Sequence, residues 1–118
     1  MITLYGIKNC DTVKKARRWL ETHAIEYQFH DFRADGIEAT DVAKWIDELG
    51  WEGLINKRST SWKGLAEDVR SSMSNQTAQD AILAQPTLIK RPLLELGQQH
   101  HVGFSAQQYQ ELFGKHTL

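Results

Sequence analysis

The chain has 118 residues, of which 41% are hydrophobic and 25% charged, and its formal net charge is -1 at pH 7. This length suits one compact domain that buries a core without support from disulfides or metals. Balanced charge argues against non-specific nucleic-acid binding, which depends on neutralising phosphates with basic side chains. The composition therefore indicates a soluble globular protein that binds no nucleic acid.

The chain contains a single cysteine, Cys10, which can form no internal disulfide. An oxidising compartment is therefore not implied. Residues 1–10 lack the basic stretch, long apolar run and cleavage site of a secretory signal. No segment approaches the ~20 apolar residues that span a bilayer. We expect a cytoplasmic protein without membrane contact.

The first third of the chain predicts a strand, a helix and a second strand. Residues 2–5 are mostly β-branched or aromatic and stop at Gly6, which is typical of a short buried strand. From Asp11 onward a helical stripe of apolar residues begins, made of Val13, Ala16, Trp19 and Leu20. Residues 25–32 alternate with period two, as in a strand. Because crossovers of this kind are right-handed, the two strands should be parallel.

The middle of the chain predicts helices. The first ends at Gly50, since glycine readily adopts the left-handed conformation of a helix terminus. Its apolar stripe consists of Val42, Trp45, Ile46 and Leu49. Ser59 or Thr60 is expected to cap a short second helix that holds Trp62 and Leu65.

A further helix is expected before Pro86, which cannot continue it. Thr77 and Asp80 have the spacing of a capping box for this helix. Its apolar positions are Ala78, Ala81 and Ile82.

The last third predicts a hairpin and a final helix. Residues 92–96 and 100–104 read as strands joined by a turn at 97–99. Ser105 and Gln108 form the capping pattern of a helix that ends at Gly114. The inward residues of this helix are Tyr109, Leu112 and Phe113. The whole order, β-α-β, a helical middle, then β-β-α, predicts a thioredoxin-like, mixed four-stranded sheet with helices on its faces.

Cys10 falls in the loop after the first strand, where the first helix begins. Helix amino ends carry unpaired N–H groups and partial positive charge, and cysteines placed there have pKa values as low as ~3.5. The positive charges of Lys8, Lys14 and Lys15 also favour an ionised thiol. The negative charge of Asp11 opposes this effect. The alternative is that Cys10 only packs, because free cysteines are often buried. The position favours a reactive thiol.

Two arginines are candidate partners of this thiol. Arg58 precedes the short helix, and Arg91 precedes Pro92 at the start of the third strand. In a thioredoxin-like sheet this strand start faces the first helix, commonly across a cis proline bond. Planar guanidinium groups there would bind an anion beside Cys10, although each arginine alone also fits an ordinary surface position.

The histidines show no spacing with Cys10 that suggests zinc, so no metal site is predicted. His100 and His101 are expected on opposite faces of the hairpin, one inward and one solvated. No glycine-rich phosphate loop is found.

Three stretches together resemble the ArsC/Spx family, in its YffB-like branch of ArsC-family reductases: LYGIKNCDTVKKARRWL, GWEGLINKRSTSW and LIKRPLLELGQQHHVGFS. The resemblance covers nearly the whole chain and implies one ArsC-like domain over 1–118. It implies a thioredoxin-like core at about residues 1–33 and 87–118, with a helical insert at about 34–86.

The resemblance also implies roles for individual residues. Cys10 matches the family nucleophile, Arg58 and Arg91 match arginines of the oxyanion site, and Pro92 matches the cis proline. The remaining residues expected to bind substrate or glutathione are Lys8, Asn9 and Thr12. Two family arginines have no counterpart here, one shortly after the cysteine and one beyond the last strand, which weakens the case for arsenate.

Three functions remain open. The first is a glutathione-dependent monothiol reductase, in which a mixed disulfide on Cys10 is resolved by an external thiol. The second is an arsenate reductase that uses glutathione and glutaredoxin. The third is a non-catalytic, Spx-like regulator that binds RNA polymerase, although Val13 replaces the second cysteine of the C-x-x-C switch common in that branch. We expect a monomer with no permanently bound cofactor and glutathione as co-substrate.

Overall fold

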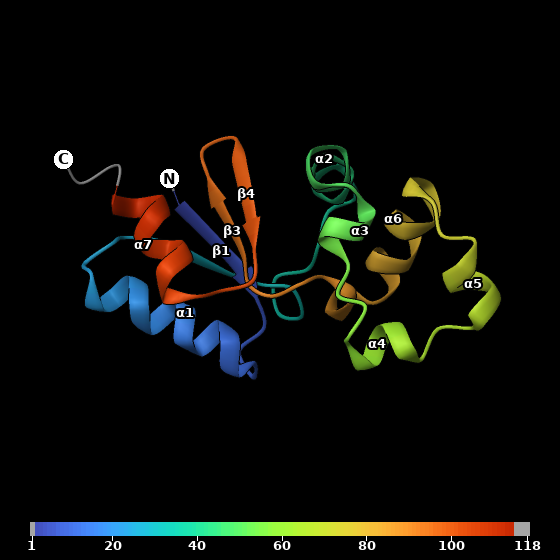
Figure 1. Ribbon diagram of the computed structural model, residues 1–118, viewed down its shortest axis with the longest axis horizontal. Coiled ribbons are helices and arrows are strands. Elements are labelled where there is room, and N and C mark those ends of the chain that lie inside the picture. Colours follow the sequence, from blue (N-terminus) through green and yellow to red (C-terminus); the bar gives the residue numbers. More distant parts are fainter. Residues whose placement is uncertain (1, 115–118) are drawn as a thin grey trace. The chain divides into compact units, whose positions relative to one another are not determined.

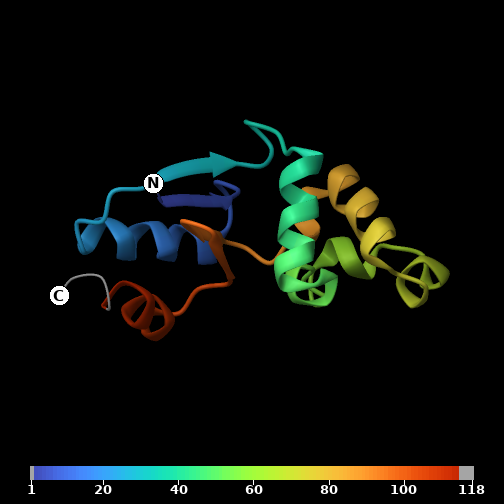
Figure 2. The same cartoon turned by 90° about the horizontal axis from the view of Figure 1, so that it is seen from above.

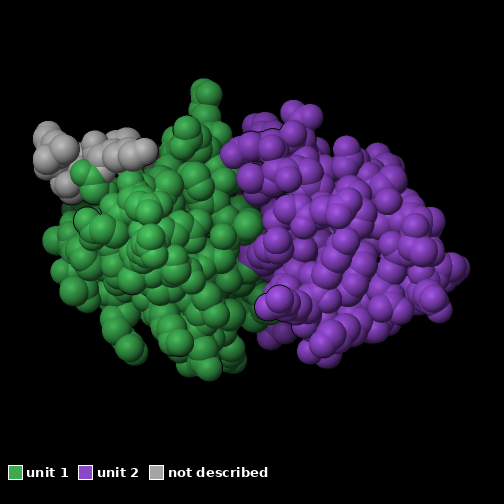
Figure 3. Space-filling view, viewed as in Figure 1, with its two compact units in different colours: residues 1–31, 91–118 green, residues 32–90 purple. Residues whose placement is uncertain are grey.

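The computed structural model describes residues 2–114, and the chain forms two compact units (Figure 3). Unit 1 comprises residues 1–31 and 91–118, and unit 2 comprises residues 32–90. Within the described residues, unit 1 contains β1 (Ile2–Gly6), α1 (Asp11–Thr22), β2 (Gln28–Asp31), β3 (Leu93–Leu96), β4 (Gln99–Val102) and α7 (Ala106–Gly114).

The strands of unit 1 form one mixed sheet in the order β2-β1-β3-β4 (Figure 1). β1 pairs with β2 in parallel, and β3 is antiparallel to both β1 and β4. This arrangement confirms the predicted thioredoxin-like sheet. It also places β3 in the interior of the sheet, with β2 and β4 at the edges.

One face of the sheet carries both helices of unit 1 (Figure 2). Leu4 of β1 and Leu94 of β3 are opposite one another and fully buried. Ala16 and Leu20 of α1 pack on this face, and α7 adds Tyr109. Burial of each large apolar side chain contributes roughly 1.5–3 kcal/mol, so this cluster fixes α1, and with it the end that carries Cys10.

Several strand boundaries differ from prediction by one to three residues. The expected strand at 25–32 is ordered as a strand only over Gln28–Asp31, because the Ile25 N–H is already donated to the Leu20 carbonyl (2.9 Å). In the hairpin, Leu96 pairs with Gln99, so Gln99 belongs to β4 and the turn is shorter than expected. Phe104 lies beyond β4, which ends at Val102.

Unit 2 is helical within residues 32–90. Its elements are α2 (Ala39–Leu49), α3 (Trp51–Leu54), α4 (Thr60–Lys63), α5 (Glu67–Ser71), α6 (Asn75–Ala84) and the 3₁₀ helix η1 (Pro86–Leu88). Gly50 ends α2 with φ 76°, as predicted, and Ser59 Oγ caps α4 by accepting from Trp62 N (3.1 Å). The short helices α3 and α5 were not predicted.

The predicted cap of α6 was wrong. Ser74, not Thr77, is the N-cap residue: its Oγ accepts from Thr77 N, while Thr77 Oγ1 accepts from Ser74 N (2.8 Å). Thr77 therefore occupies the third helical position, and Asp80 lies within the helix. A threonine in place of the usual Glu or Gln hid the box from the sequence pattern.

No helix among the described residues has the length and apolar character needed to cross a membrane.

Candidate functional site: the Cys10 loop of unit 1

Cys10 is the N-cap residue of α1, as predicted. Its backbone is extended (φ -119°, ψ 122°), and its carbonyl accepts the first helical bond from Lys14 N (3.0 Å). Its side chain accepts no capping hydrogen bond from the helix and is half-buried. The side chain is therefore not used to complete α1.

The loop that carries Cys10 is short and held at both ends. β1 ends at Gly6, and Val13 lies in the first turn of α1, fully buried. A Cβ added at Gly6 would lie only 2.8 Å from Cγ2 of Val13, so the strand end and the helix are in close contact. This contact fixes the direction in which the chain leaves the sheet toward Cys10.

The charges around Cys10 are mainly positive. Lys8 and Asn9 in the loop are exposed, and so are Lys14 and Lys15 of α1. The partial positive charge of a helix amino end adds to these cations. Asp11 is the acidic residue in the first turn of α1 and acts against them. Thr12, in the same turn, is half-buried.

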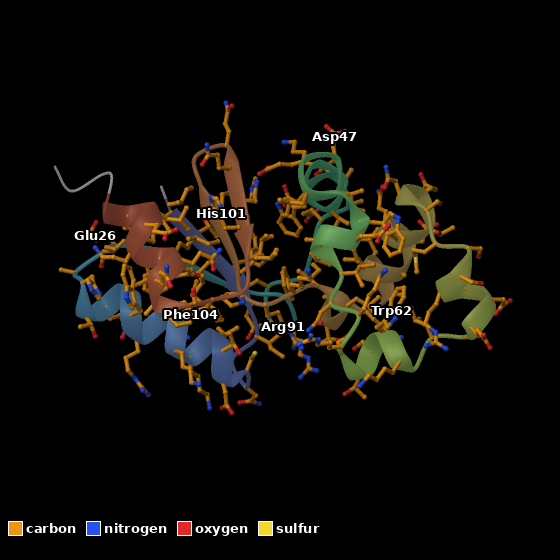
Figure 4. All side chains as sticks on the ribbon, in the orientation of Figure 1. Glu26, Asp47, Trp62, Arg91, His101 and Phe104 are labelled. Carbon is orange, nitrogen blue, oxygen red and sulfur yellow. The ribbon has the colours of Figure 1, made fainter. Side chains whose placement is uncertain are left out.

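The chain enters β3 through a cis peptide bond between Arg91 and Pro92, as predicted. Leu93 pairs with Tyr5, so Pro92 lies beside Gly6, at the end of β1 from which the Cys10 loop leaves. Pro92 is buried, and Arg91 is half-buried at the entry to the strand (Figure 4). The structure thus brings Pro92 and the Cys10 loop to the same end of the sheet.

β3 itself offers no free edge. It is paired on both sides, and the Pro92 carbonyl accepts a hydrogen bond from Gly103 N (2.9 Å). The strand after Pro92 is therefore not available to pair with the backbone of a peptide ligand. The Arg91 backbone just before it has no hydrogen-bond partner among residues 2–114 and remains able to pair.

Arg58 belongs to unit 2, whereas Cys10 and Arg91 belong to unit 1. Arg58 is exposed in the turn before α4, and its N–H is donated to Asn56 Oδ1 (3.0 Å). Asn56 is anchored in turn by donating its N–H to the Leu88 carbonyl (2.8 Å). The turn that presents Arg58 is thus well defined within unit 2, and the role of Arg58 toward Cys10 stays a prediction.

Two further polar residues at this end of the sheet were not singled out from the sequence. Asp31 pairs with Gly6 at the end of β2 and is only 6% exposed, and the ring of His30 lies 4.9 Å from that of Tyr5. The period-two pattern had placed Asp31 on the inward side of its strand, which was the available signal. A buried carboxylate beside the end of β1 adds a candidate group to the site.

The hairpin histidines differ from expectation, because both are partly buried and neither is fully exposed. His100 is 10% exposed in its side chain and lies 3.0 Å from Glu95 Oε1 through Nε2. His101 is half-buried, with a buried Nε2 that has no hydrogen-bond partner among the described residues. Within the described residues, no three His, Cys, Asp or Glu side chains are arranged to hold a metal ion.

A β2-β1-β3-β4 sheet, a cysteine at the start of the first helix and a cis proline entering β3 define a thioredoxin-like protein. The model of the ArsC family matches residues 5–112, and the chain belongs to the ArsC family.

Relatives agree with this membership. An uncharacterized protein of Haemophilus influenzae is 46% identical over 113 residues, covering 96% of this chain and 99% of its own. The global transcriptional regulator Spx of Lactiplantibacillus plantarum is 30% identical over 107 residues, covering 89% of this chain and 80% of its own. A transcriptional regulator is thus among the proteins similar to this chain.

Solved structures show the same fold. A protein named YFFB is 42% identical, with a TM-score of 0.89 over 94% of this chain and 97% of its own. An arsenate reductase (ArsC) related protein of Brucella melitensis is 46% identical, with a TM-score of 0.80 over 95% of this chain and 93% of its own. The similarity covers both units of the chain.

Proposed function

We propose that this protein is a glutathione-dependent monothiol reductase in which the Cys10 thiolate is the nucleophile. The observation that carries the proposal is the position of Cys10. It is the N-cap of a well-packed helix, yet its side chain makes no capping hydrogen bond and the residue is only half-buried. Thiolates are stabilised at such helix ends, especially near lysines.

The reaction consists of two thiol–disulfide exchanges. The Cys10 thiolate attacks the glutathione sulfur of a glutathionylated substrate, the S–S bond breaks, and the substrate leaves as a thiolate that takes a proton. Glutathione then attacks the mixed disulfide on Cys10, forming oxidised glutathione and restoring the Cys10 thiolate. Since the chain has one cysteine, this second thiol must come from outside.

Glutathione is an anionic peptide, and the residues proposed to bind it suit that chemistry. Lys8 and the arginines Arg58 and Arg91 are assigned to its carboxylates, because guanidinium groups bind carboxylates through two parallel hydrogen bonds. The free Arg91 backbone is assigned to its peptide groups. Asn9 and Thr12 flank the sulfur in sequence and complete the proposed site.

Mass spectrometry of the protein after mixing with oxidised glutathione tests the proposal. We expect one added glutathione, located on Cys10, and turnover of a glutathionylated peptide by the wild-type protein. Cys10→Ser should lose both, while its circular dichroism spectrum stays unchanged. Turnover that survives Cys10→Ser would exclude the mechanism.

Arsenate is the second candidate electrophile, favoured by the name of the similar Brucella protein. Its test is a steady-state assay with arsenate, glutathione and glutaredoxin. Saturable, efficient turnover would support arsenate as the substrate, whereas trace activity would favour the thiol reductase. We expect only trace activity with arsenate, because Lys14 and Lys15 are found where the family arsenate reductases have an arginine.

The Spx relatives make a regulatory role the third candidate. A regulator of this kind would retain RNA polymerase in a pull-down. Its Cys10→Ser variant would still function normally in the cell. Because Val13 occupies the position of a second cysteine, an internal disulfide switch is excluded.

A further inference from the structure

A small cavity of about 240 Å³ lies beside α1 in unit 1, away from the thiol. It is lined by Lys15, Arg18, Trp19, Thr22, His23 and Phe104. All but Phe104 belong to α1 and its C-cap residue His23 and occupy positions i, i+3, i+4, i+7 and i+8 counted from Lys15, so they form one stripe of the helix. Phe104 comes from the loop between β4 and α7 and lies next to α1 (Figure 4).

The floor of this cavity is aromatic and firmly built. Trp19 stacks on His23 with ring centres 3.9 Å apart, and its edge contacts the ring of Tyr109 at 5.5 Å. Phe104 also packs on Tyr109, at 4.7 Å, and Tyr109 is fully buried. His23 Nδ1 donates to the Trp19 carbonyl (2.8 Å), which holds the stacked pair in place.

The rim of the cavity is cationic and unpaired. Lys15 and Arg18 are both exposed, and neither forms an ion pair with an acidic side chain among residues 2–114. Their charges therefore remain available to a ligand. The volume is below the roughly 300–1,000 Å³ of cofactor and drug sites, so the cavity suits one large side chain.

We propose that this stripe docks a protein partner through an aromatic side chain preceded by acidic residues, and that this partner presents its disulfide to Cys10. The proposal rests on the proposed function, because it names the substrate class of the same thiol. Tryptophan and arginine are enriched in binding hot spots, and the cationic rim is complementary to carboxylates.

The spacing along α1 defines the partner further. With a helical rise of about 1.5 Å per residue, Trp19 lies about 13 Å along the helix from Cys10. Nine residues at about 3.6 per turn also place Trp19 half a turn around the helix from Cys10, so the path over the helix surface is about 20 Å. An extended peptide covers this path in about six residues, at about 3.3 Å each. Lys15 and Arg18 lie between the two ends. A partner segment of the form Cys-Gly-Gly-Gly-Glu-Glu-Phe would therefore place its cysteine at Cys10, its acids at the cations and its ring at the cavity.

The probe is this peptide, made as a mixed disulfide with 2-nitro-5-thiobenzoate. Cys10 attacks the peptide sulfur, a new S–S bond joins Cys10 to the peptide, and the coloured thiobenzoate thiolate leaves. Matched peptides replace both Glu by Lys or the Phe by Ala. The same leaving group on 2-mercaptoethanol measures the basal reactivity of Cys10.

We expect the acidic aromatic peptide to react about tenfold faster than either matched peptide at low salt, with the advantage shrinking as salt is added. Arg18→Glu should reverse the preference for Glu over Lys. At about 0.15 M salt it should leave the 2-mercaptoethanol rate unchanged, since Arg18 is about 12 Å along the helix from Cys10 and the Debye length is then about 8 Å. Lys44→Glu, an exposed cation of α2, is the matched control and should keep the wild-type preference. Equal rates for the three peptides would overturn the proposal.

A second measurement separates docking from thiol chemistry. Cys10→Ser is titrated with the S-methylated peptides, which cannot exchange, and tryptophan fluorescence reports binding. In one outcome the wild-type protein shows no reaction with the 2-mercaptoethanol reagent, while the S-methylated acidic aromatic peptide still binds, and binds more weakly to Arg18→Glu. That result would contradict the proposed function and support the docking site. Binding of all S-methylated peptides with equal affinity would overturn the docking site.

Discussion

Gly6 and Val13 join the end of β1 to the first turn of α1 so closely that a Cβ at position 6 would lie 2.8 Å from Cγ2 of Val13. Both residues are buried, and Val13 is fully so. Residues 7–9, which lie between Gly6 and Cys10, form the loop that carries the sulfur. The packing of one glycine against one valine therefore determines where the thiol stands.

Gly6→Ala should lower the free energy of unfolding by about 1–3 kcal/mol, the usual cost of overpacking a core. Urea denaturation followed by tryptophan fluorescence measures the change. Gly53→Ala is the matched control, because its new Cβ would make only an ordinary contact, 3.6 Å from Leu49 Cβ. A Gly6→Ala protein as stable as wild type would show that the backbone moves apart at no cost.

Arg91→Ala should raise the KM for glutathione about tenfold or more, because a charge-assisted hydrogen bond contributes about 1.5–3 kcal/mol. Steady-state kinetics with a glutathionylated peptide measures this. Arg91→Lys keeps the charge but loses the two-pronged geometry, so it should recover only part of the loss. A KM that Arg91→Ala leaves unchanged would remove Arg91 from the proposed site.

Arg58→Ala tests whether Arg58 binds glutathione, as proposed from the ArsC resemblance. We expect a higher KM with little change in unfolding free energy, because Arg58 is exposed and its guanidinium has no partner among residues 2–114. Lys63→Ala, an exposed cation of α4 in the same unit, is the matched control and should leave the KM unchanged. Equal behaviour of the two variants would make Arg58 an ordinary surface charge.

Ser74→Ala should destabilise the protein by about 1 kcal/mol, because it removes the capping box of α6. Thermal or urea denaturation measures the loss. Asp80→Ala serves as the comparison, since the sequence had assigned the cap to Thr77 and Asp80, whereas Asp80 is exposed within the helix. A larger loss for Asp80→Ala than for Ser74→Ala would restore the original assignment.

The sequence predicted those features that depend on local pattern. The apolar stripe of α1, the glycine that ends α2 and the cap at Ser59 all follow from spacing and side-chain type, and each was found. The position of Cys10 at a strand-to-helix junction could be predicted for the same reason.

Features that depend on tertiary pairing were not predicted. The start of β2 is set by the Ile25 N–H bond to Leu20, and the pairing of Leu96 with Gln99 sets the hairpin turn. Asp31 became a candidate only when the register placed it beside Gly6. Helices α3 and α5 span four and five residues, too short for a periodic pattern to reveal.

Tyr109 gives the stability of unit 1 a dependence on alkaline pH. Burial raises the pKa of Tyr109, and its hydroxyl has no hydrogen-bond partner among the described residues. Below pH ~10 the tyrosine is protonated in both folded and unfolded chains, so the stability is fully present there. Above pH ~10 only the unfolded chain ionises, which lowers the free energy of unfolding as pH rises.

Tyr109→Phe should therefore flatten the alkaline fall in stability while keeping the ring contacts with Trp19 and Phe104. At neutral pH it should be as stable as wild type or up to about 1 kcal/mol more stable, because it removes an unpaired buried hydroxyl. Tyr27→Phe is the comparison: burial, then the hydrogen bond to Glu21, raises the pKa of Tyr27, but Arg17 opposes this. Urea denaturation between neutral pH and pH ~11 measures both variants. A marked loss at neutral pH for Tyr109→Phe would mean that the hydroxyl is bonded in solution.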